Sequence, residues 1–276
     1  MELSFSKSVI LGVIQGLTEF LPISSSGHIV IAKKLLLVKS AGMLYEVFMH
    51  FGTFLSVIVI FRKEIADIVS SLWVGMVDLL KKRSLNSELT KNHKSRLGIF
   101  LIIASIPAGT VGILLKSELS KFFENPLFVS IALIFTGIIL YITKYFKKGG
   151  MGVRFLDSII IGCAQAFAIL PGISRSGMTI SAGIFLRINR EDAVKFSFFL
   201  SLPAIFGATI LETFNIFHYD LNVNDLIQIF LAFFSAFLSG CFAIKVLMKI
   251  VIAGKFFLFS YYCILIGILG IVFFIT

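Results

Sequence analysis

The sequence predicts an all-α integral membrane protein with an inverted-topology repeat, two re-entrant helical hairpins and about six transmembrane helices. Composition gives the first reason: 58% of the 276 residues are hydrophobic, 14% are charged, and the mean hydropathy is +1.00. These values lie far outside the range of soluble domains, so the chain must use the bilayer as its solvent. The second reason is a polar motif that occurs twice in the chain.

The repeated motif occupies residues Gly12 to Gly27 and, 150 positions later, residues Gly162 to Gly177. The two copies read GVIQGLTEFLPISSSG and GCAQAFAILPGISRSG and are identical at six of 16 ungapped positions. Each copy places a polar run, broken by proline and glycine, between apolar flanks. In membrane proteins such runs mark helices that are interrupted at depth and present backbone and side chains to a ligand. The match indicates an internal duplication.

The duplication divides the chain into two repeats within a single membrane domain that spans residues 1–276. The first repeat is expected to occupy about residues 1–115, with the tip of its re-entrant hairpin at residues 19–28. The second repeat is expected to occupy about residues 150–276, with its tip at residues 170–179.

Apolar segments that are long enough to cross a bilayer follow one another along the chain. Four of them carry no charged residue: 97–115, 127–143, 226–244 and 256–275. Two weaker candidates are 43–61, which contains Glu46 and His50, and 196–211. Segment 65–80 is amphipathic and fits either an interfacial helix or a span.

Charged residues orient these segments across the membrane. Residues 81–96 contain six basic residues and one acidic residue, which places them in the cytoplasm by the positive-inside rule. Residues 212–225 contain three carboxylates and neither Lys nor Arg, which is typical of an outer loop. The first hairpin then enters from outside and the second from the cytoplasm, so that the tips near Pro22 and Pro171 meet around the midplane. Lysines early in the first repeat argue mildly against this orientation: Lys33, Lys34 and Lys39.

Other features of the composition narrow the class of protein. The three cysteines lie in apolar runs without pairing or ligand spacing, so we expect buried thiols and neither a disulfide nor a zinc site: Cys163, Cys241 and Cys263. The N-terminus lacks the features of a cleavable signal peptide and is expected to belong to the fold. The net charge of +10 fits cytoplasmic loops and anionic lipid headgroups, and no nucleic-acid partner is expected.

The second motif has the chemistry of a phosphate cradle. Residues 171–179 read PGISRSGMT, which combines a flexible glycine, hydroxyl groups and one guanidinium at the expected start of a helix. Arg175 offers a planar fork for phosphate, and an arginine deep in a membrane segment needs an anionic partner or water. The alternative is that Arg175 only pairs with a carboxylate such as Glu19.

The first motif supplies acid–base and ligand groups. Gln15 and Glu19 are four residues apart, so they share one helical face and can jointly ligate a hard cation or position a water. Histidine has its natural pKa in the range needed for acid–base or nucleophilic work, which makes His28 a candidate, and at least one of the neighbouring serines is expected to cap a helix. Together these groups indicate phosphoryl chemistry. Ordinary roles are expected for the remaining polar candidates, of which His50 is the one that could line the same cavity: Glu46, His50, His93 and His218.

These motifs match those of a known family. Gln15 and Glu19 fit its (E/Q)xxxE motif, residues 171–179 fit PGxSRSxxT at every fixed position, and Ser25 and His28 lie in an SSxGH-like run. The chain resembles, over its whole length, the undecaprenyl pyrophosphate phosphatases of the bacitracin-resistance type. The resemblance implies an integral enzyme of the bacterial plasma membrane that hydrolyses undecaprenyl diphosphate to undecaprenyl phosphate and inorganic phosphate. This reaction recycles the lipid carrier of peptidoglycan synthesis and confers bacitracin resistance.

The resemblance also implies partners and residue roles. The substrate would be a polyprenyl diphosphate lipid bound at a site that opens to the outer face, bacitracin would compete for that substrate without binding the protein, and a homodimer is left open. Glu19, with Gln15 as a second ligand, would bind Mg²⁺ or Ca²⁺ or activate the nucleophile, and Ser25 or His28 would be the nucleophile or its partner. The diphosphate would be held by Arg175 and by the residues around it in the two tips: Ser24, Ser26, Gly172, Ser174, Ser176 and Thr179. Gln15 stands where more acidic family members carry Glu, so Glu19 would be the main ligand of a metal ion.

Two other classes of protein remain as alternatives. Inverted repeats with broken helices are also typical of secondary transporters and flippases, although the unequal chemistry of the two tips favours an enzyme. A lipid phosphatase of the type-2 phosphatidic acid phosphatase class is disfavoured, because the next histidine after Arg175 is His218, in the expected outer loop. The phenylalanines at 196, 198 and 199 either line a groove for the prenyl chain or, as is commoner, pack in the core.

Overall fold

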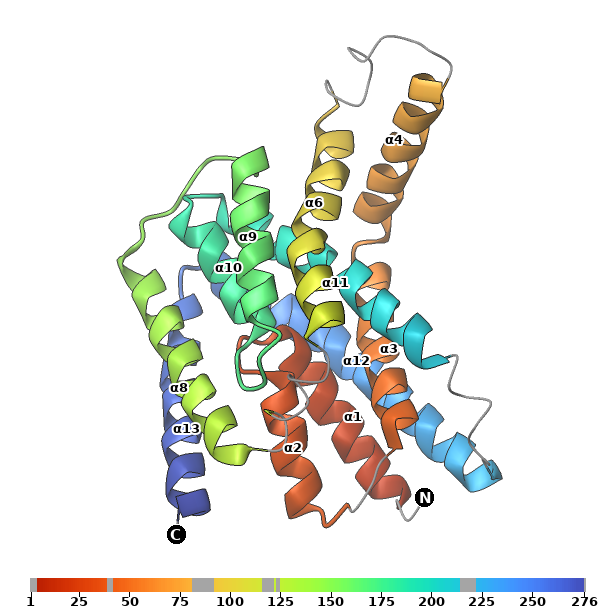
Figure 1. Cartoon of the computed structure of the whole chain (residues 1–276), viewed down its shortest axis with the longest axis vertical. Helices are drawn as coiled ribbons and strands as arrows, with labels where there is room; N and C mark the ends of the chain where they lie inside the picture. Colours follow the sequence, from red (N-terminus) through yellow and green to blue (C-terminus); the bar gives the residue numbers. More distant parts are fainter. Residues whose placement is uncertain are drawn as a thin grey trace.

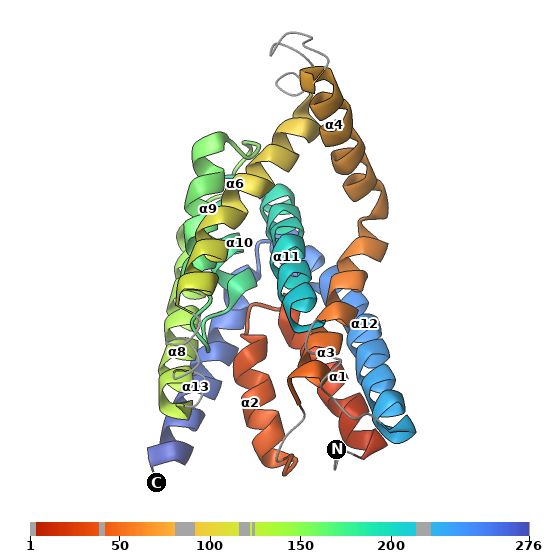
Figure 2. The same cartoon turned by 45° about the vertical axis from the view of Figure 1, so that its right-hand side comes forward.

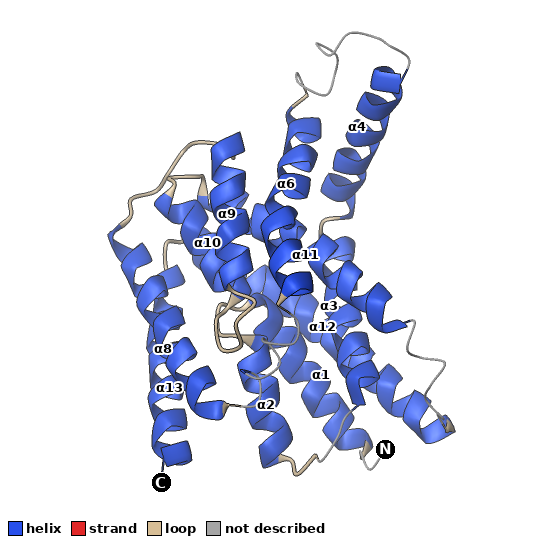
Figure 3. Cartoon of the chain, viewed as in Figure 1, coloured by secondary structure: helices blue, strands red, loops and turns tan. Residues whose placement is uncertain are grey.

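The computed structural model describes residues 4–38, 42–80, 92–115, 122, 125–213 and 222–275, and it confirms the predicted all-α fold. Within these ranges eleven α-helices and two short 3-10 helices carry the structure (Figures 1 and 3). Four of these helices form two hairpins, and the others surround them.

The first hairpin consists of α1 (Phe5–Phe20) and α2 (Ser25–Leu35). Ser4 starts α1 by accepting a hydrogen bond from the backbone N–H of Lys7. The helix cannot continue through Pro22, which lacks a backbone N–H, and the chain reverses there. Ser24 then caps α2 by accepting from the backbone N–H of Gly27. The break predicted from the first motif is therefore present.

The second hairpin consists of α9 (Phe155–Phe167) and α10 (Arg175–Phe185). At its tip Gly172 adopts a φ of 88°, a conformation that favours glycine, and Ser174 caps α10 by accepting from Gly177 N at 3.1 Å. A β-bridge between Met151 and Ile188 joins the two ends of this hairpin at its base.

The two hairpins enter the molecule from opposite ends, and their tips meet near the middle (Figure 1). The α1–α2 hairpin starts from the end that holds both termini. Direct contacts join the tip segments, because Ser176 Oγ donates to the carbonyl of Leu21 at 3.3 Å. Cys263 Sγ, from the last helix, also donates to the carbonyl of Pro22 at 3.3 Å. Polar groups from both motifs are thereby brought to one place.

Seven further helices surround the hairpins. They are α3 (Gly42–Ile60), α4 (Arg62–Leu80), α6 (His93–Leu114), α8 (Pro126–Ile142), α11 (Arg190–Thr213), α12 (Val223–Ile252) and α13 (Phe259–Ile275). Short 3-10 turns, η1 (Thr143–Tyr145) and η3 (Phe256–Leu258), extend α8 and precede α13. In the turned view, α1, α3 and α12 form one side of the molecule and α8 and α13 the other, with the tips between them (Figure 2).

Four segments of the described chain are long and apolar enough to cross a membrane: His93–Leu114, Pro126–Tyr145, Val223–Ile252 and Phe256–Phe274. The pair α3 and α4 meets the same test together, but the two helices are bent by 85°, as in a broken span or a re-entrant loop. The structure thus contains four or five candidate spans where the sequence predicts about six. The predicted span 196–211 falls within α11 (Arg190–Thr213), which is not among the candidate spans found in the described residues.

Equivalent glycines of the two repeats set how each hairpin packs. A Cβ on Gly12 would lie 2.3 Å from the carbonyl oxygen of Ala232 on α12, and a Cβ on Gly162 would lie 2.5 Å from that of Ala104 on α6. Any side chain at these positions would push the helices apart. The first arm of each hairpin therefore lies in backbone contact with a long apolar helix.

The core between the hairpins is aromatic, which agrees with the favoured packing role of three phenylalanines, whereas the exposure of one cysteine differs from the sequence prediction. Phe196, Phe198 and Phe199 are all buried, and Phe198 packs edge to face on Phe20 at 5.4 Å, so these rings belong to the core and do not line a prenyl groove. Cys263 is buried as predicted, whereas Cys163 is exposed on α9.

Candidate active site

A single carboxylate lies at the meeting point of the two tips. Glu19 Oε1 accepts a hydrogen bond from Arg175 Nη2 at 2.6 Å, while its Oε2 accepts from Ser25 Oγ at 2.7 Å and from Gln15 Nε2 at 2.9 Å. The Glu19 side chain is only 6% exposed. We call Gln15, Glu19, Ser25, His50 and Arg175 the Glu19 cluster. It brings together four residues that the sequence predicts for the site.

The duplicated helix breaks place these side chains. Ser25 and Arg175 hold the same position in their repeats, because each is the first residue of the second arm of its hairpin. Because the hairpins enter from opposite ends, the side chains of Ser25 and Arg175 both reach the carboxylate of Glu19. Gln15 and Glu19 lie four residues apart on α1, so they share a face as predicted.

Arg175 makes the contact that the simpler interpretation of the second motif predicts, an ion pair with Glu19 at 2.6 Å. Its side chain is 20% exposed, and only Nη2 is used in the pair. A guanidinium carries five N–H donors, so the pair leaves donors that can meet a second anion. Arg175 also stands at the start of α10, where unpaired N–H groups and the helix dipole favour negative charge.

His50 on α3 completes the cluster, although the sequence predicts an ordinary role for it. Its Nδ1 lies 3.0 Å from Gln15 Nε2 and 3.6 Å from Glu19 Oε2. The signal in the sequence is the helical spacing of Glu46, His50 and Thr53, which puts three polar groups on one face of an apolar run.

His28 lies beside the cluster and not within it. Its Nδ1 is 2.8 Å from the carbonyl oxygen of Ser24, and its Nε2 is 2.7 Å from the hydroxyl of Tyr262 on α13, whose ring stacks on the imidazole. Among the described residues, no hydrogen bond or ion pair joins His28 to Glu19 or Arg175. Sequence reasoning misses Tyr262 because it sits in a uniformly apolar final segment.

The remaining hydroxyl groups predicted for substrate binding brace the tips. Ser24 and Ser174 cap their helices, which confirms the expected capping role of the serines. Their Oγ atoms also lie 3.3 Å from those of Ser26 and Ser176, respectively. Thr179 Oγ1 donates to the carbonyl of Arg175 at 2.8 Å and lies 2.6 Å from Ser197 Oγ, while the Gly172 carbonyl accepts from Thr136 at 3.4 Å.

Two of the polar candidates with expected ordinary roles have other places in the structure. Glu46 forms an ion pair with Lys33, which explains its presence in an apolar segment. His93 lies at the far end of the molecule, and His218 lies outside the described residues.

The Glu19 cluster does not present the oxygen donors that Mg²⁺ or Ca²⁺ prefers. Both Glu19 oxygens already accept hydrogen bonds, and Gln15 turns its amide nitrogen, and not its oxygen, towards them. Across the described parts of the chain, no three His, Cys, Asp or Glu side chains are grouped as metal ligands. In this arrangement the predicted pair of metal ligands does not fit a cation.

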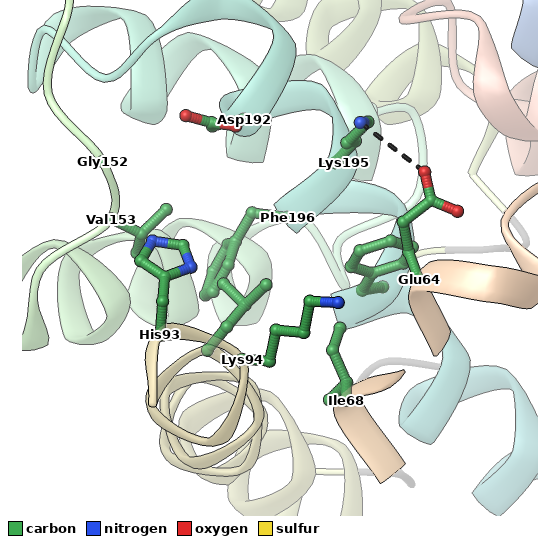
Figure 4. Close-up of a pocket in the computed structure, with 11 residues that line it drawn as sticks. Glu64, Ile68, His93, Lys94, Gly152, Val153, Asp192, Lys195 and Phe196 are labelled. Atoms are coloured by element: carbon green, nitrogen blue, oxygen red, sulfur yellow. Dashed lines mark ion pairs between the residues drawn. The ribbon is translucent and has the colours of Figure 1, made fainter. Parts of the chain in front are cut away.

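A separate pocket of about 160 Å³ lies among α4, α6 and α11, away from the tips (Figure 4). Its polar lining includes Glu64, His93, Lys94, Asp192 and Lys195, and Lys195 Nζ lies 3.7 Å from Glu64 Oε1. Phe196 forms part of its apolar wall. None of the residues predicted for the active site lines this pocket.

Comparisons with known proteins agree with the resemblance of the motifs. Residues 8–269 match the family described as bacitracin resistance protein BacA. The chain is 39% identical over 264 residues to an undecaprenyl-diphosphatase of Desulfosudis oleivorans, which covers 95% of each chain. It is 35% identical over 274 residues to an undecaprenyl-diphosphatase of Methanosphaera stadtmanae, with 98% of each chain covered. The chain therefore belongs to the bacitracin resistance protein BacA family.

Proposed function

We propose that this chain is an undecaprenyl-diphosphatase, a multi-pass membrane enzyme that hydrolyses undecaprenyl diphosphate to undecaprenyl phosphate and inorganic phosphate. The observation that carries the proposal is the Glu19 carboxylate, which binds a serine hydroxyl through one oxygen and a guanidinium through the other. Nucleophile, base and phosphate clamp are the three groups that phosphoryl transfer requires.

Ser25 is the nucleophile in this proposal. Its hydroxyl lies 2.7 Å from Glu19 Oε2, within the reach of a nucleophile–base pair, whereas the Nε2 of His28 is occupied by Tyr262. Ser25 Oγ attacks the terminal phosphorus as its proton passes to Glu19, and the bond from that phosphorus to the bridging oxygen breaks. Undecaprenyl phosphate leaves with the bridging oxygen. The proton held by Glu19 passes to the departing undecaprenyl phosphate. Water then cleaves the phosphoserine: its hydroxyl bonds to phosphorus, its proton passes through Glu19 to Ser25 Oγ, and inorganic phosphate is released.

Arg175 stabilises the negative charge of the phosphoryl group during both steps. A guanidinium binds phosphate oxygens with two parallel N–H donors, and a site largely shielded from water strengthens this interaction. The start of α10 adds backbone N–H groups beside it. Dependence on Mg²⁺ or Ca²⁺ stays a prediction for experiment.

The arrangement in the membrane follows from the same geometry. In the proposal, the two repeats form one membrane domain with inverted re-entrant hairpins, and the tips lie near the midplane. The diphosphate reaches the tips from the outer face, and the prenyl chain stays in apolar surroundings. Non-helical backbone at this depth is tolerable because protein surrounds it.

Phosphate release from undecaprenyl diphosphate by the purified protein tests the proposal. We expect release by the wild type and a loss of at least about 100-fold in Ser25→Ala and in Arg175→Lys, because each removes a group that acts on the reacting phosphate. Parallel assays with Mg²⁺, Ca²⁺ and a chelator test the cation. Trapping of ³²P on the wild type but not on Ser25→Ala would identify the nucleophile.

A flippase is the second candidate, since opposed broken hairpins also suit alternating access. The unequal chemistry of the tips, with Glu19 on one and Arg175 on the other, argues for the enzyme. A folded wild type that moves a labelled prenyl phosphate across vesicles without releasing phosphate would favour the flippase.

A further inference from the structure

We propose that His50 is a substrate-binding residue that donates its Nε2–H to the diphosphate, and that Gln15 serves to hold His50 in the tautomer that makes this donation possible. This inference rests on the proposed function, because it concerns the same anionic substrate. It assigns a role to a side chain that lies outside both repeated motifs.

The hydrogen bonds of Gln15 determine the tautomer of His50. Gln15 Nε2 lies 2.9 Å from Glu19 Oε2 and 3.0 Å from His50 Nδ1. A carboxylate oxygen only accepts, so the amide must present its nitrogen, which has two hydrogens to donate and cannot accept. His50 Nδ1 is therefore the acceptor. A neutral imidazole that accepts through Nδ1 carries its proton on Nε2.

The exposure of the cluster places this Nε2–H at its open side. Gln15 is buried and Glu19 is 6% exposed, whereas the His50 side chain is 42% exposed. Because Nδ1 faces the buried amide, the accessible part of the ring is the far edge, which carries Nε2. His50 lies within the continuous helix α3 (Gly42–Ile60), which fixes the direction in which its side chain projects.

The charge of the cluster suits an anionic ligand at this edge. Glu19 is the one carboxylate of the Glu19 cluster, and Arg175 neutralises it. A second carboxylate at position 15 would add a negative charge where the diphosphate has to bind, and it could not donate to Nδ1. Gln15 avoids both effects. The departure from the more acidic motif is thus explained as a match to His50 and not as the loss of a metal ligand.

Steady-state phosphate release by the full-length protein with undecaprenyl diphosphate tests the role of His50. We expect His50→Ala to lower kcat/KM by about 10- to 100-fold, mainly through a higher KM, the range for a hydrogen bond to a charged group. His50→Gln should recover most of this loss, since its amide can accept from Gln15 and donate outwards. Gln15→Leu should raise KM similarly, and the double variant Gln15→Leu/His50→Ala should lose little more.

His93→Ala is the matched control, because His93 lies in the separate pocket at the other end and should leave KM unchanged. Competitive inhibition by orthophosphate gives a second readout that does not depend on turnover of the variant, and its Ki should rise in His50→Ala.

An unchanged KM and an unchanged phosphate Ki in His50→Ala would overturn the inference. A His50→Gln variant as impaired as His50→Ala, with both folded by thermal unfolding, would also overturn the donor role. A wild type that releases no phosphate would instead contradict the proposed function, so the two failures are distinct.

Discussion

The Glu19–Arg175 ion pair joins the two hairpins and also belongs to the proposed active site. Variants of this pair can therefore separate its effect on the stability of the protein from its effect on phosphate release. Glu19→Gln leaves Arg175 as an unpaired, largely buried charge, which costs about 3–5 kcal/mol in comparable cases. The double variant Glu19→Gln/Arg175→Met removes both charges and should regain most of that stability. We expect none of these variants to release phosphate, because base and clamp are both required.

Thermal unfolding in detergent and phosphate assays on the same samples measure both effects. A stable double variant with substantial turnover would mean that Arg175 only neutralises Glu19, as the simpler interpretation of the second motif holds. Arg175→Met alone serves as the control for removal of the clamp.

The His28–Tyr262 contact predicts a second coupled pair. His28→Ala and Tyr262→Phe each remove the same 2.7 Å hydrogen bond between α2 and α13, so their effects on unfolding should be non-additive by about 1 kcal/mol. Tyr261→Phe is the matched control, since the neighbouring Tyr261 contacts Tyr141 instead. Additive losses in a double-mutant cycle would show that the contact contributes no net coupling.

Whether a residue of the site could be predicted depends on how far apart in the sequence it and its partners lie. The spacing of Gln15 and Glu19 within one helix predicts that they share a face, the phosphate-binding chemistry of the second motif predicts Arg175, and the family resemblance predicts Ser25. Tyr262 escapes prediction, and His50 is predicted only as a residue that could line the same cavity. Their contacts depend on how α3 and α13 pack against the hairpins, and no local pattern encodes that packing.

At the scale of elements, the tip of the second hairpin depends on Gly172. Its φ of 88° disfavours any side chain, and a Cβ there would lie 2.4 Å from the carbonyl oxygen of Val129 on α8. We expect Gly172→Ala to destabilise the protein by at least about 2 kcal/mol, through strain and displacement of α8.

Gly109 provides the matched control within α6, because a Cβ at that position meets nothing within 4 Å. Gly109→Ala should stabilise the helix by about 0.5–1 kcal/mol. If Gly172→Ala unfolds at the wild-type temperature, the close approach of the tip to α8 is incorrect.

Helix positions were predictable where apolar runs end at clear capping or breaking residues. Asn125 and Pro126 start α8, and Asn222 with Asp225 starts α12, close to the ends of the predicted runs. The 85° bend between α3 and α4 was not predictable, since Arg62 and Lys63 mark a boundary without giving an angle. Bends and hairpin contacts are set by tertiary packing, which hydropathy does not report.

For the whole molecule, the distribution of charge relative to the hairpins predicts the orientation in the membrane. Basic residues flank the start of α9, the end of α10 and the turn between α12 and α13: Lys144, Lys147, Lys148, Arg154, Arg187, Arg190 and Lys255. Of the lysines that argue against this orientation, Lys33 is neutralised by Glu46, and Lys34 lies over the ring of Phe274 at 4.7 Å. The positive-inside rule then assigns the α9 side to the cytoplasm and both termini to the outside.

Labelling of single cysteines in intact cells measures this orientation. In a background without Cys163, Cys241 and Cys263, we expect an impermeant maleimide to label Asn224→Cys at the start of α12. Lys148→Cys, between α8 and α9, should be labelled only after the cells are opened. Phosphate release by each variant controls for folding. The reverse pattern would turn the molecule over and place the entrance of the first hairpin in the cytoplasm, so the diphosphate would have to reach the tips from the cytoplasmic side.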